Sequence, residues 1–407
     1  MSRVGLLFVF VFLCGSPPVP AQDQRPPSGR KLKELVAQYL AGDAGDREKI
    51  RKDCDATFAP LVADYKLKKL RKDLLQAAAS NGREVSFKGS HFFYEDETGK
   101  YIARSGGKAL FIGLHGGGVN SGSAESSAGS MGGGGYSWIF PEVLHKTGRG
   151  WTSIGTEEFV MDLVLAAKRS GKVDPDRIYL TGHSMGGYGT WTIGAHHADQ
   201  FAGTAAYAGA PSPVFVSGSL TEVEMIERGV LPNLHNLRHF VFQSTDDPQV
   251  PPGPNQFAVA ELKKLHEKHP TGYDYRYDEV DDRGHAAPKE GYGPSQAWVA
   301  EKTRDPRPRK IIWQPALTWK HQFYWLHWPK PEIGSELIAE VQDGNVVQIE
   351  ELTGARINGL QILVGEPLFD LDEDIVVRFG QNEVFRGKAE RRLSTLLLTP
   401  PNHDQGL

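Results

Sequence analysis

The segment Gly182–Gly186, which reads Gly-His-Ser-Met-Gly, constrains the fold of this 407-residue chain more than any other segment. It lies between an apolar run, Ile178–Leu180, and a helical pattern that begins near Met185. A serine in the pattern Gly-x-Ser-x-Gly sits on a sharp turn from strand to helix, where its hydroxyl stands clear of the sheet and only small neighbours fit. The segment therefore predicts that Ser184 is a nucleophile. An ordinary glycine-rich turn is the alternative, because the chain contains 46 glycines.

Strand and helix patterns alternate around this turn. The continuous apolar run Ala109–Leu114 is typical of a strand buried on both faces. Thr156 is expected to cap a helix that carries apolar residues on one side. Downstream, a strand pattern at 238–243, a helical pattern at 257–268 and a strand pattern at 273–277 continue the series. This alternation predicts an α/β domain over residues 84–305, with a mostly parallel sheet covered on both faces.

The two ends of the chain differ in character from this middle part. Arg3, an apolar run at 4–13 and the small residue Ala21 predict a cleaved signal peptide over residues 1–21, and hence a secreted or periplasmic protein. An uncleaved anchor is the alternative. Residues 22–83 predict a linker and a helical N-terminal extension. A charged, proline-broken stretch at 301–310 marks a boundary, and the strand patterns beyond it predict a small C-terminal β domain over residues 311–400.

Composition narrows the expected partners and cofactors. The formal net charge of −4 gives no basic excess of the kind that a nucleic-acid surface needs, so no nucleic-acid partner is expected. No His or Cys cluster has zinc spacing and no Walker-type loop occurs, so we expect neither a metal nor a cofactor. Once the signal peptide is removed, we expect no stable membrane span.

A glycine-rich segment, His115–Gly118, directly follows the buried strand pattern. Acyl transfer builds negative charge on a carbonyl oxygen, and backbone N–H groups that are already in place stabilise it. Glycines let such amides approach closely, so we expect Gly117 or Gly118 to supply one donor of this oxyanion hole and Met185 the other. Taken alone, the segment would indicate only a flexible loop. The residues expected to contact the substrate are His115, Gly116, His183 and Tyr188.

The acid and the base that a serine nucleophile needs should follow it in the order acid, then histidine. Asp247 lies after the strand pattern at 238–243 and is the predicted acid, with the adjacent Asp246 as its rival; either could instead be a turn-forming residue. His285 follows the next strand pattern and is the predicted base. The glycine-rich stretch at 121–136 is expected to be a mobile rim of the cleft. The histidines in or at the ends of helical patterns fit the base less well: His196, His197, His266 and His269.

On these residues the chain resembles bacterial secreted α/β-hydrolases of the prolyl-oligopeptidase-like, phospholipase/carboxylesterase and feruloyl or polyhydroxybutyrate esterase type. The resemblance rests on Leu114–Gly118, Asp174–Trp191, Asp247–Pro251 and Gly284-His285, and it covers about residues 84–305. It implies the α/β-hydrolase fold, a Ser–Asp–His triad, esterase or less often peptidase activity, and no cofactor. The C-terminal part looks like a β appendage of some such hydrolases, and its role is not implied.

Together these features predict a secreted serine esterase that hydrolyses carboxylic esters through an acyl-enzyme on Ser184. Water activated through His285 would release the acyl group. The ester is expected on a small molecule or a polymer, such as a plant polysaccharide or a polyester. Two alternatives stay open: a prolyl-oligopeptidase-like serine peptidase, and a non-catalytic binding protein with an inert hydrolase core.

Overall fold

The structure is a computed structural model of the whole chain. It describes residues 92–96, 99–118, 120–146, 150–153, 155–365 and 367–389, together with Val85 and the single residues 34, 38, 46, 49 and 50. Those five single residues are helical. The expected signal peptide, nearly all of the expected N-terminal extension and the last residues of the chain lie outside the described residues.

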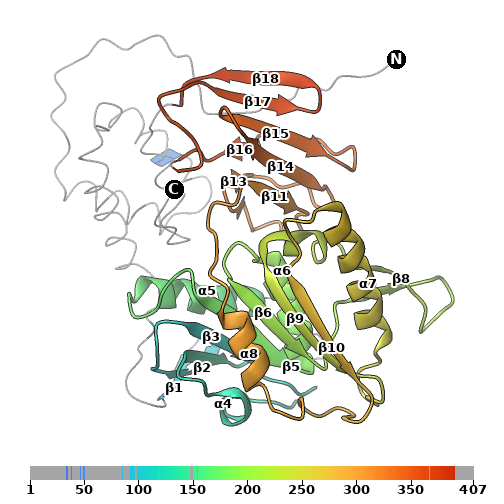
Figure 1. Cartoon of the computed structure of the whole chain (residues 1–407). Coiled ribbons are helices and arrows are strands. Elements are labelled where there is room, and N and C mark those ends of the chain that lie inside the picture. Colours follow the sequence, from blue (N-terminus) through green and yellow to red (C-terminus); the bar gives the residue numbers. More distant parts are fainter. Residues whose placement is uncertain are drawn as a thin grey trace.

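An eight-stranded sheet forms the centre of the molecule (Figure 1). Its strand order is β1-β2-β4-β3-β5-β6-β9-β10, and β2 alone runs antiparallel to the other strands of this sheet. The mostly parallel sheet predicted from the sequence is therefore confirmed. The strands are β1 Phe92–Asp96, β2 Gly99–Arg104, β3 Leu110–Leu114, β4 Ser137–Pro141, β5 Ile178–His183, β6 Gly203–Tyr207, β9 Arg238–Ser244 and β10 Tyr275–Val280.

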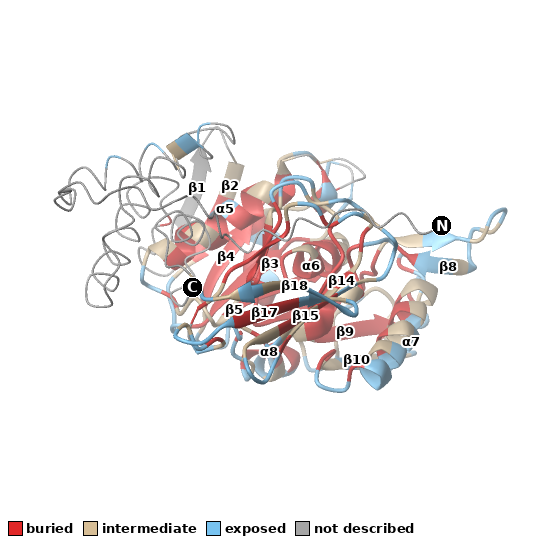
Figure 2. Ribbon diagram, turned by 90° about the horizontal axis from the view of Figure 1, so that it is seen from above, coloured by how far each residue is buried: buried red, intermediate tan, exposed pale blue. Residues whose placement is uncertain are grey.

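Helices cover both faces of this sheet. One face packs on α5 (Thr156–Arg169), α6 (Met185–His196) and α7 (Gly253–Lys268), and the other on α4 (Ala124–Met131) and α8 (Gly293–Ala300). Successive residues of a strand point to opposite faces, so Leu110 and Ile112 join the first core and Phe111 joins the second. In Figure 2, α6 is buried whereas α7 keeps an exposed side.

The C-terminal part forms two small sheets. A five-stranded sheet has the order β11-β14-β15-β17-β18, and a three-stranded sheet has the order β12-β13-β16. In β14, Leu337, Ala339 and Val341 are buried and alternate with more exposed residues, which is the pattern of a sheet with one packed face. The strands are β11 Lys310–Trp313, β12 Gln322–Phe323, β13 Leu326–His327, β14 Leu337–Gln342, β15 Val346–Glu351, β16 Gln361–Ile362, β17 Ile375–Phe379 and β18 Asn382–Gly387.

These C-terminal sheets pack against the amino ends of the parallel strands. The Tyr324 hydroxyl donates to the Ala198 carbonyl at 2.9 Å, and Lys320 pairs with Asp199 at 2.7 Å; both partners precede β6. The Asn236 side chain, just before β9, donates to the Lys310 carbonyl at 2.9 Å. In Figure 1 the C-terminal strands accordingly stack above one end of the central sheet. The carboxyl ends of the parallel strands lie at the opposite end of the sheet, away from the C-terminal strands.

The stretch at 121–136, expected to be a mobile rim, contains a helix that its glycines did not suggest. Residues 124–131 form α4, whose first turn is closed by a capping box between Ser123 and Ser126. Ala124, Ala128 and Met131 bury one side of this helix against the sheet. The apolar spacing and the serine cap therefore outweigh the low helix propensity of the neighbouring glycines.

The cap expected at the start of α5 was also wrong. Gly155, with φ of 80°, is the residue before the helix, and Thr156 is already helical. The Thr156 hydroxyl instead forms a hydrogen bond of 2.8 Å with the Ser153 hydroxyl. Four further short elements complete the described part of the chain: β7 Pro213–Phe215, β8 Val223–Ile226 and the 3₁₀ turns Gly150–Thr152 and Pro232–Asn236.

Candidate active site

Ser184 stands on the turn between β5 and α6. Its backbone has φ of 59° and ψ of −122°, a strained conformation for a residue with a side chain, which costs about 1–3 kcal/mol. Two backbone bonds hold the turn: the Ser184 N–H donates to the Tyr207 carbonyl at 2.8 Å, and the Ser184 carbonyl accepts from the Tyr188 N–H at 3.0 Å. The serine is thus fixed at the carboxyl edge of the sheet.

The glycines around Ser184 are required by backbone contacts. A Cβ on Gly182 would lie 2.3 Å from the Gly186 carbonyl oxygen, and a Cβ on Gly186 would lie 2.2 Å from the Leu114 carbonyl oxygen. These separations are far below van der Waals contact. The elbow can form only because the chain around Ser184 has no side chains at these positions, as the sequence pattern predicts.

The structure brings Ser184, His285 and Asp247 together. His285 Nε2 lies 2.8 Å from Ser184 Oγ, and His285 Nδ1 lies 2.7 Å from Asp247 Oδ2. The three side chains follow the ends of β5, β9 and β10, and Ser184 and His285 are 101 residues apart in the chain. With Nδ1–H donating to the carboxylate, Nε2 is left to accept the serine proton, which is the arrangement of a serine nucleophile with its base.

The carboxylate that faces His285 belongs to Asp247 and not to its rival Asp246. The Asp247 side chain is fully shielded from solvent, and its Oδ1 accepts from the amides of Gln249 at 2.8 Å and Val250 at 3.0 Å. Asp246 is exposed and accepts from the backbone amide of Gly284 at 2.7 Å. Asp246 thus bonds to the backbone beside His285, whereas Asp247 bonds to the imidazole itself.

A buried amide pair supports the loop that carries Asp247, and sequence reasoning missed it. Gln243 Nε2 donates to the carbonyls of Ser244 and Val250, and Asn255 Nδ2 donates to Gln243 Oε1 at 2.8 Å. Asn255 also donates to the Gly209 carbonyl at 3.0 Å, next to the elbow. The spacing of Gln243 and Asn255 in the sequence carries no signal for this contact, because it depends on how α7 returns to the sheet.

The segment after β3 lies beside the nucleophile. A Cβ on Gly116 would be 3.3 Å from Ser184 Cβ, so the backbone of this segment passes close to the serine. Gly117 is exposed and has φ of 120°, a conformation that favours glycine. The Gly118 amide already donates to Ser121 Oγ at 2.7 Å. Of the two expected loop donors, Gly117 is therefore the one whose amide is not engaged by that serine.

His115 cannot contact a substrate, which corrects the sequence prediction. It is fully buried, its Nε2 accepts from the Val143 amide at 3.2 Å, and its Nδ1 lies 2.8 Å from the Gly116 carbonyl. The acceptor role of Nε2 places the proton on Nδ1, and burial lowers the pKa of His115. The Trp151 indole donates to the His115 carbonyl at 3.0 Å. His115 therefore supports the glycine segment from its buried side.

His183 and Tyr188 flank the candidate nucleophile and are both partly exposed. The His183 and His285 rings lie 5.0 Å apart between centroids. Burial, and then the charge of His285, lowers the pKa of His183 to about 4, so it is neutral at pH 7. Burial raises the pKa of Tyr188, and the nearby Asp247 raises it further. Both side chains can thus offer neutral polar groups beside Ser184.

The other histidines lie away from the nucleophile. His196 Nδ1 and His197 Nε2 lie 2.9 Å and 3.1 Å from Glu157 Oε1, at the end of α6 farthest from Ser184. Burial opposes the charge of Glu157, but these two imidazoles hold its pKa well below the usual range. His266 Nδ1 lies 2.7 Å from the Gly272 carbonyl. These contacts are structural.

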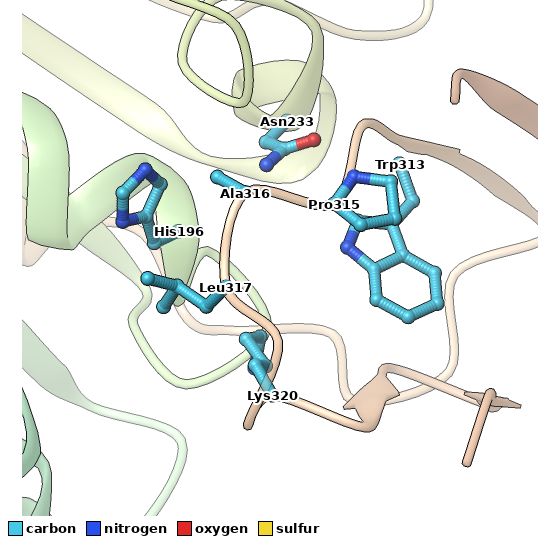
Figure 3. A pocket seen from close by; sticks show the side chains of 7 residues that line it. All are labelled: His196, Asn233, Trp313, Pro315, Ala316, Leu317 and Lys320. Carbon is cyan, nitrogen blue, oxygen red and sulfur yellow. The ribbon is translucent and has the colours of Figure 1, made fainter. Parts of the chain in front are cut away.

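A small pocket lies between the end of α6 and the segment that follows β11 (Figure 3). His196 ends α6 and Ser184 precedes its first residue, so about 18 Å of helix separates this pocket from the candidate nucleophile. It is not part of the site at Ser184. The residues that line it are His196, Asn233, Trp313, Pro315, Ala316, Leu317 and Lys320.

Within the described ranges, no group of three or more His, Cys, Asp or Glu side chains is placed to hold a metal ion. The helices of the described part of the chain are also too short or too polar to cross a bilayer.

The fold and this site define a serine hydrolase of the α/β-hydrolase class. Residues 127–303 match the model of the prolyl oligopeptidase family, so this part of the chain is similar to that family. The match covers less than half of the 407 residues and includes Ser184, Asp247 and His285. No curated protein matches the chain.

Three solved structures illustrate the likeness. A thermostable esterase is 20% identical, with 53% of this chain and 63% of that chain covered and a TM-score of 0.36. An α/β-hydrolase enzyme from a Medee basin deep-sea metagenome library is 14% identical, with 49% and 85% covered and a TM-score of 0.37. The acylaminoacyl peptidase of Pyrococcus horikoshii is 14% identical, with 50% and 38% covered and a TM-score of 0.34. With scores this low, the three structures say nothing about the substrate of this chain.

Proposed function

We propose that this protein is a serine esterase that hydrolyses carboxylic esters through an acyl-enzyme on Ser184. The observation that carries the proposal is the unbroken chain of hydrogen bonds from Ser184 Oγ through His285 to Asp247, with distances of 2.8 Å and 2.7 Å. A hydroxyl is a weak nucleophile at neutral pH and needs a base in contact with it. His285 is placed to be that base.

In the acylation step, Ser184 Oγ attacks the ester carbonyl carbon while His285 Nε2 takes the hydroxyl proton. The buried Asp247 carboxylate holds the imidazole by Nδ1–H and stabilises the imidazolium that forms. The carbonyl oxygen becomes an oxyanion, which we assign to the amides of Met185 and Gly117. The C–O bond to the alcohol then breaks, and the alcohol leaves with the proton from His285.

Deacylation repeats these steps with water. His285 Nε2 removes a proton from a water molecule, whose oxygen attacks the acyl carbon bound to Ser184. The carboxylic acid departs and the proton on His285 returns to Ser184 Oγ, so the site is restored without any cofactor taking part.

A peptide amide is the second candidate substrate, and the family match over residues 127–303 favours it. The same three side chains would serve both reactions. An amine is a poorer leaving group than an alcohol, so amide cleavage demands more from the acid step of His285 than ester cleavage does. An ester is therefore the less demanding substrate for this site, and it is the one we propose.

A substrate panel tests the proposal. Purified protein is assayed with nitrophenyl acetate, butyrate and ferulate esters and with peptide nitroanilides, next to Ser184→Ala. We expect ester hydrolysis to exceed peptide cleavage, and Ser184→Ala to lower kcat by about 10⁴-fold or more. Ser130→Ala, an exposed serine of α4, serves as the matched control and should keep full activity.

Three results would overturn the proposal. Preferential cleavage of the peptides would make the protein a peptidase. Full esterase activity in Ser184→Ala would show that Ser184 is not the nucleophile. Failure of folded wild-type protein to react with a fluorophosphonate would favour a binding protein with an inert hydrolase core.

We also infer that the protein is exported, which rests on the sequence of residues 1–21. The inferred limits of the catalytic domain, 84–305, and of the C-terminal β domain, 311–400, likewise rest on sequence patterns. Expression of the full chain should yield an extracellular or periplasmic protein that begins at Gln22. A mature protein that still starts at Met1 in the cytoplasm would contradict the inference.

A further inference from the structure

Two loops meet beside Ser184, and more hydrogen bonds join them than the one between His285 and Asp247. The acid loop, residues 244–250, begins at the last residue of β9, and the base loop, residues 280–287, begins at the last residue of β10. The Arg283 amide donates to Ser244 Oγ at 3.1 Å, and the Gly284 amide donates to Asp246 Oδ1 at 2.7 Å. His285 Nδ1 then lies 2.7 Å from Asp247 Oδ2. Three consecutive residues of the base loop are therefore each held by one side chain of the acid loop.

Asp246 and Ser244 act as one unit in this contact. The Ser244 hydroxyl donates to Asp246 Oδ1, the same oxygen that accepts from Gly284. Ser244 is buried at the end of β9, so it fixes the position of the exposed Asp246 carboxylate. The hydrogen bond from Ser244, followed by that from Gly284, lowers the pKa of Asp246, so its carboxyl is ionised at neutral pH.

The base loop depends on such an anchor. Between the end of β10 at Val280 and the start of α8 at Gly293 there is no regular structure. Gly284 adopts φ of 53°, so the chain reverses just before His285. Beyond His285, a turn is closed by the bond from the Ala286 amide to the Arg283 carbonyl at 3.0 Å. The direction of the imidazole is thus set by where residues 283 and 284 are held.

A role as a simple turn former does not account for Asp246. Asp residues in turns bond to amides two or three residues onward, and Asp247 does this with Gln249 and Val250. Asp246 instead bonds to Gly284, which is 38 residues away and adjacent to the base.

We propose that Asp246 is a positioning residue, which with Ser244 clamps the backbone before His285 and so keeps Nε2 directed at Ser184 Oγ. The proposal deepens the function proposed above and rests on the roles of Ser184 and His285. Asp246 touches neither the nucleophile nor the imidazole in the structure, so its effect acts through the base loop. A displacement of a catalytic group by about 1 Å can cost about 100-fold in rate, so a loosened loop should be visible in kcat.

Four variants test the clamp: Asp246→Ala, Asp246→Asn, Ser244→Ala and, as the matched control, Asp282→Ala. Asp282 is an exposed acidic residue of the same loop that takes no part in the clamp. We expect Asp246→Ala and Ser244→Ala to lower kcat by about 10- to 100-fold while KM changes little. Asp246→Asn should keep most of the activity, because an amide oxygen can also accept from both Gly284 and Ser244. Asp282→Ala should equal the wild type.

Hydrogen exchange of the amides at 283–286 gives a readout that needs no substrate. Exchange there should accelerate in Asp246→Ala and stay at the wild-type rate in Asp246→Asn and Asp282→Ala. A merely structural role would lower the melting temperature without this local change and without the separation of kcat from KM. Because Asp246 is exposed, the variants at this position are expected to fold.

The outcomes separate the clamp from the proposed function. If Ser184→Ala abolishes hydrolysis but Asp246→Ala keeps the wild-type kcat and exchange, the clamp is wrong and the function stands. If Asp246→Asn is as slow as Asp246→Ala, hydrogen-bond positioning is also wrong. If the wild-type protein hydrolyses nothing, the proposed function fails, and the exchange data alone decide whether Asp246 holds the loop.

Discussion

The turn at Ser184 can form only because certain neighbouring positions are glycines, which have no side chain. A Cβ on Gly187 would lie 2.6 Å from the Tyr207 carbonyl oxygen and 3.0 Å from Gly209 Cα, both rigid backbone atoms. Gly187→Ala should therefore lower the free energy of unfolding by about 1–3 kcal/mol and slow ester hydrolysis, since α6 must move away from β6. Chemical denaturation and kcat measure the two effects.

Gly253→Ala is the control at the same scale. Gly253 is the first residue of α7, and no atom lies within 4 Å of the position of an added Cβ. This substitution should leave stability unchanged or raise it by about 0.4–1 kcal/mol. Equal losses in both variants would mean that close packing at the elbow is not the reason for Gly187.

At the scale of elements, the start of α4 depends on one serine. Ser123 Oγ accepts from the Ser126 amide at 3.2 Å, and Glu142 Oε2 accepts from the Ala124 amide at 3.2 Å. Ser123→Ala should cost about 1 kcal/mol of unfolding free energy, because one helix-end amide loses its partner. Urea denaturation measures the cost. Ser130→Ala, near the other end of the helix, should be neutral, and a comparable loss there would contradict the capping argument.

Elements with strong local patterns could be predicted from the sequence, and elements with mixed patterns could not. The runs that became β3, β5 and β9 have apolar segments, Leu110–Leu114, Ile178–Leu180 and Phe240–Phe242, that favour buried strands. The strand β6, Gly-Thr-Ala-Ala-Tyr, has small residues at three of its positions and so only a weak strand pattern, and β11 begins inside a charged stretch. Within the expected C-terminal β domain, the apolar stretch at 357–363 forms only the short strand Gln361–Ile362. In each case tertiary packing decided the outcome.

The candidate site divides in the same way. Motif and chain order suffice to select Ser184 and His285, because the elbow and the strand ends are local features. The choice between Asp246 and Asp247 depends on which of two adjacent side chains faces the imidazole, and no sequence pattern reports that direction. His115 is predicted to contact the substrate, whereas its side chain is fully buried. Burial of this kind follows only from the assembled fold.

At the scale of the whole molecule, buried charges join the C-terminal sheets to the hydrolase core. Lys320 Nζ lies 2.7 Å from Asp199 Oδ1, and their side chains are only 10% and 2% exposed. Burial opposes the charge of Asp199, but Lys320 holds the pKa of this carboxyl below its usual value. Asp199 also accepts from Gln200 Nε2 at 2.8 Å. The carboxylate thus depends on a cation from the other part of the chain.

Removing that cation should destabilise the protein strongly. Lys320→Met leaves the Asp199 charge buried without its partner, which should lower the free energy of unfolding by about 3–5 kcal/mol. Adding Asp199→Asn removes the stranded charge and should restore a large part of the loss. Lys264→Met, on the exposed pair of Lys264 with Glu261, should change stability by less than about 1 kcal/mol. Guanidinium denaturation of the wild type, Lys320→Met, the double variant and Lys264→Met measures these differences. If the double variant is no more stable than Lys320→Met, the packing of the lysine stem, and not its charge, stabilises the contact between the two parts.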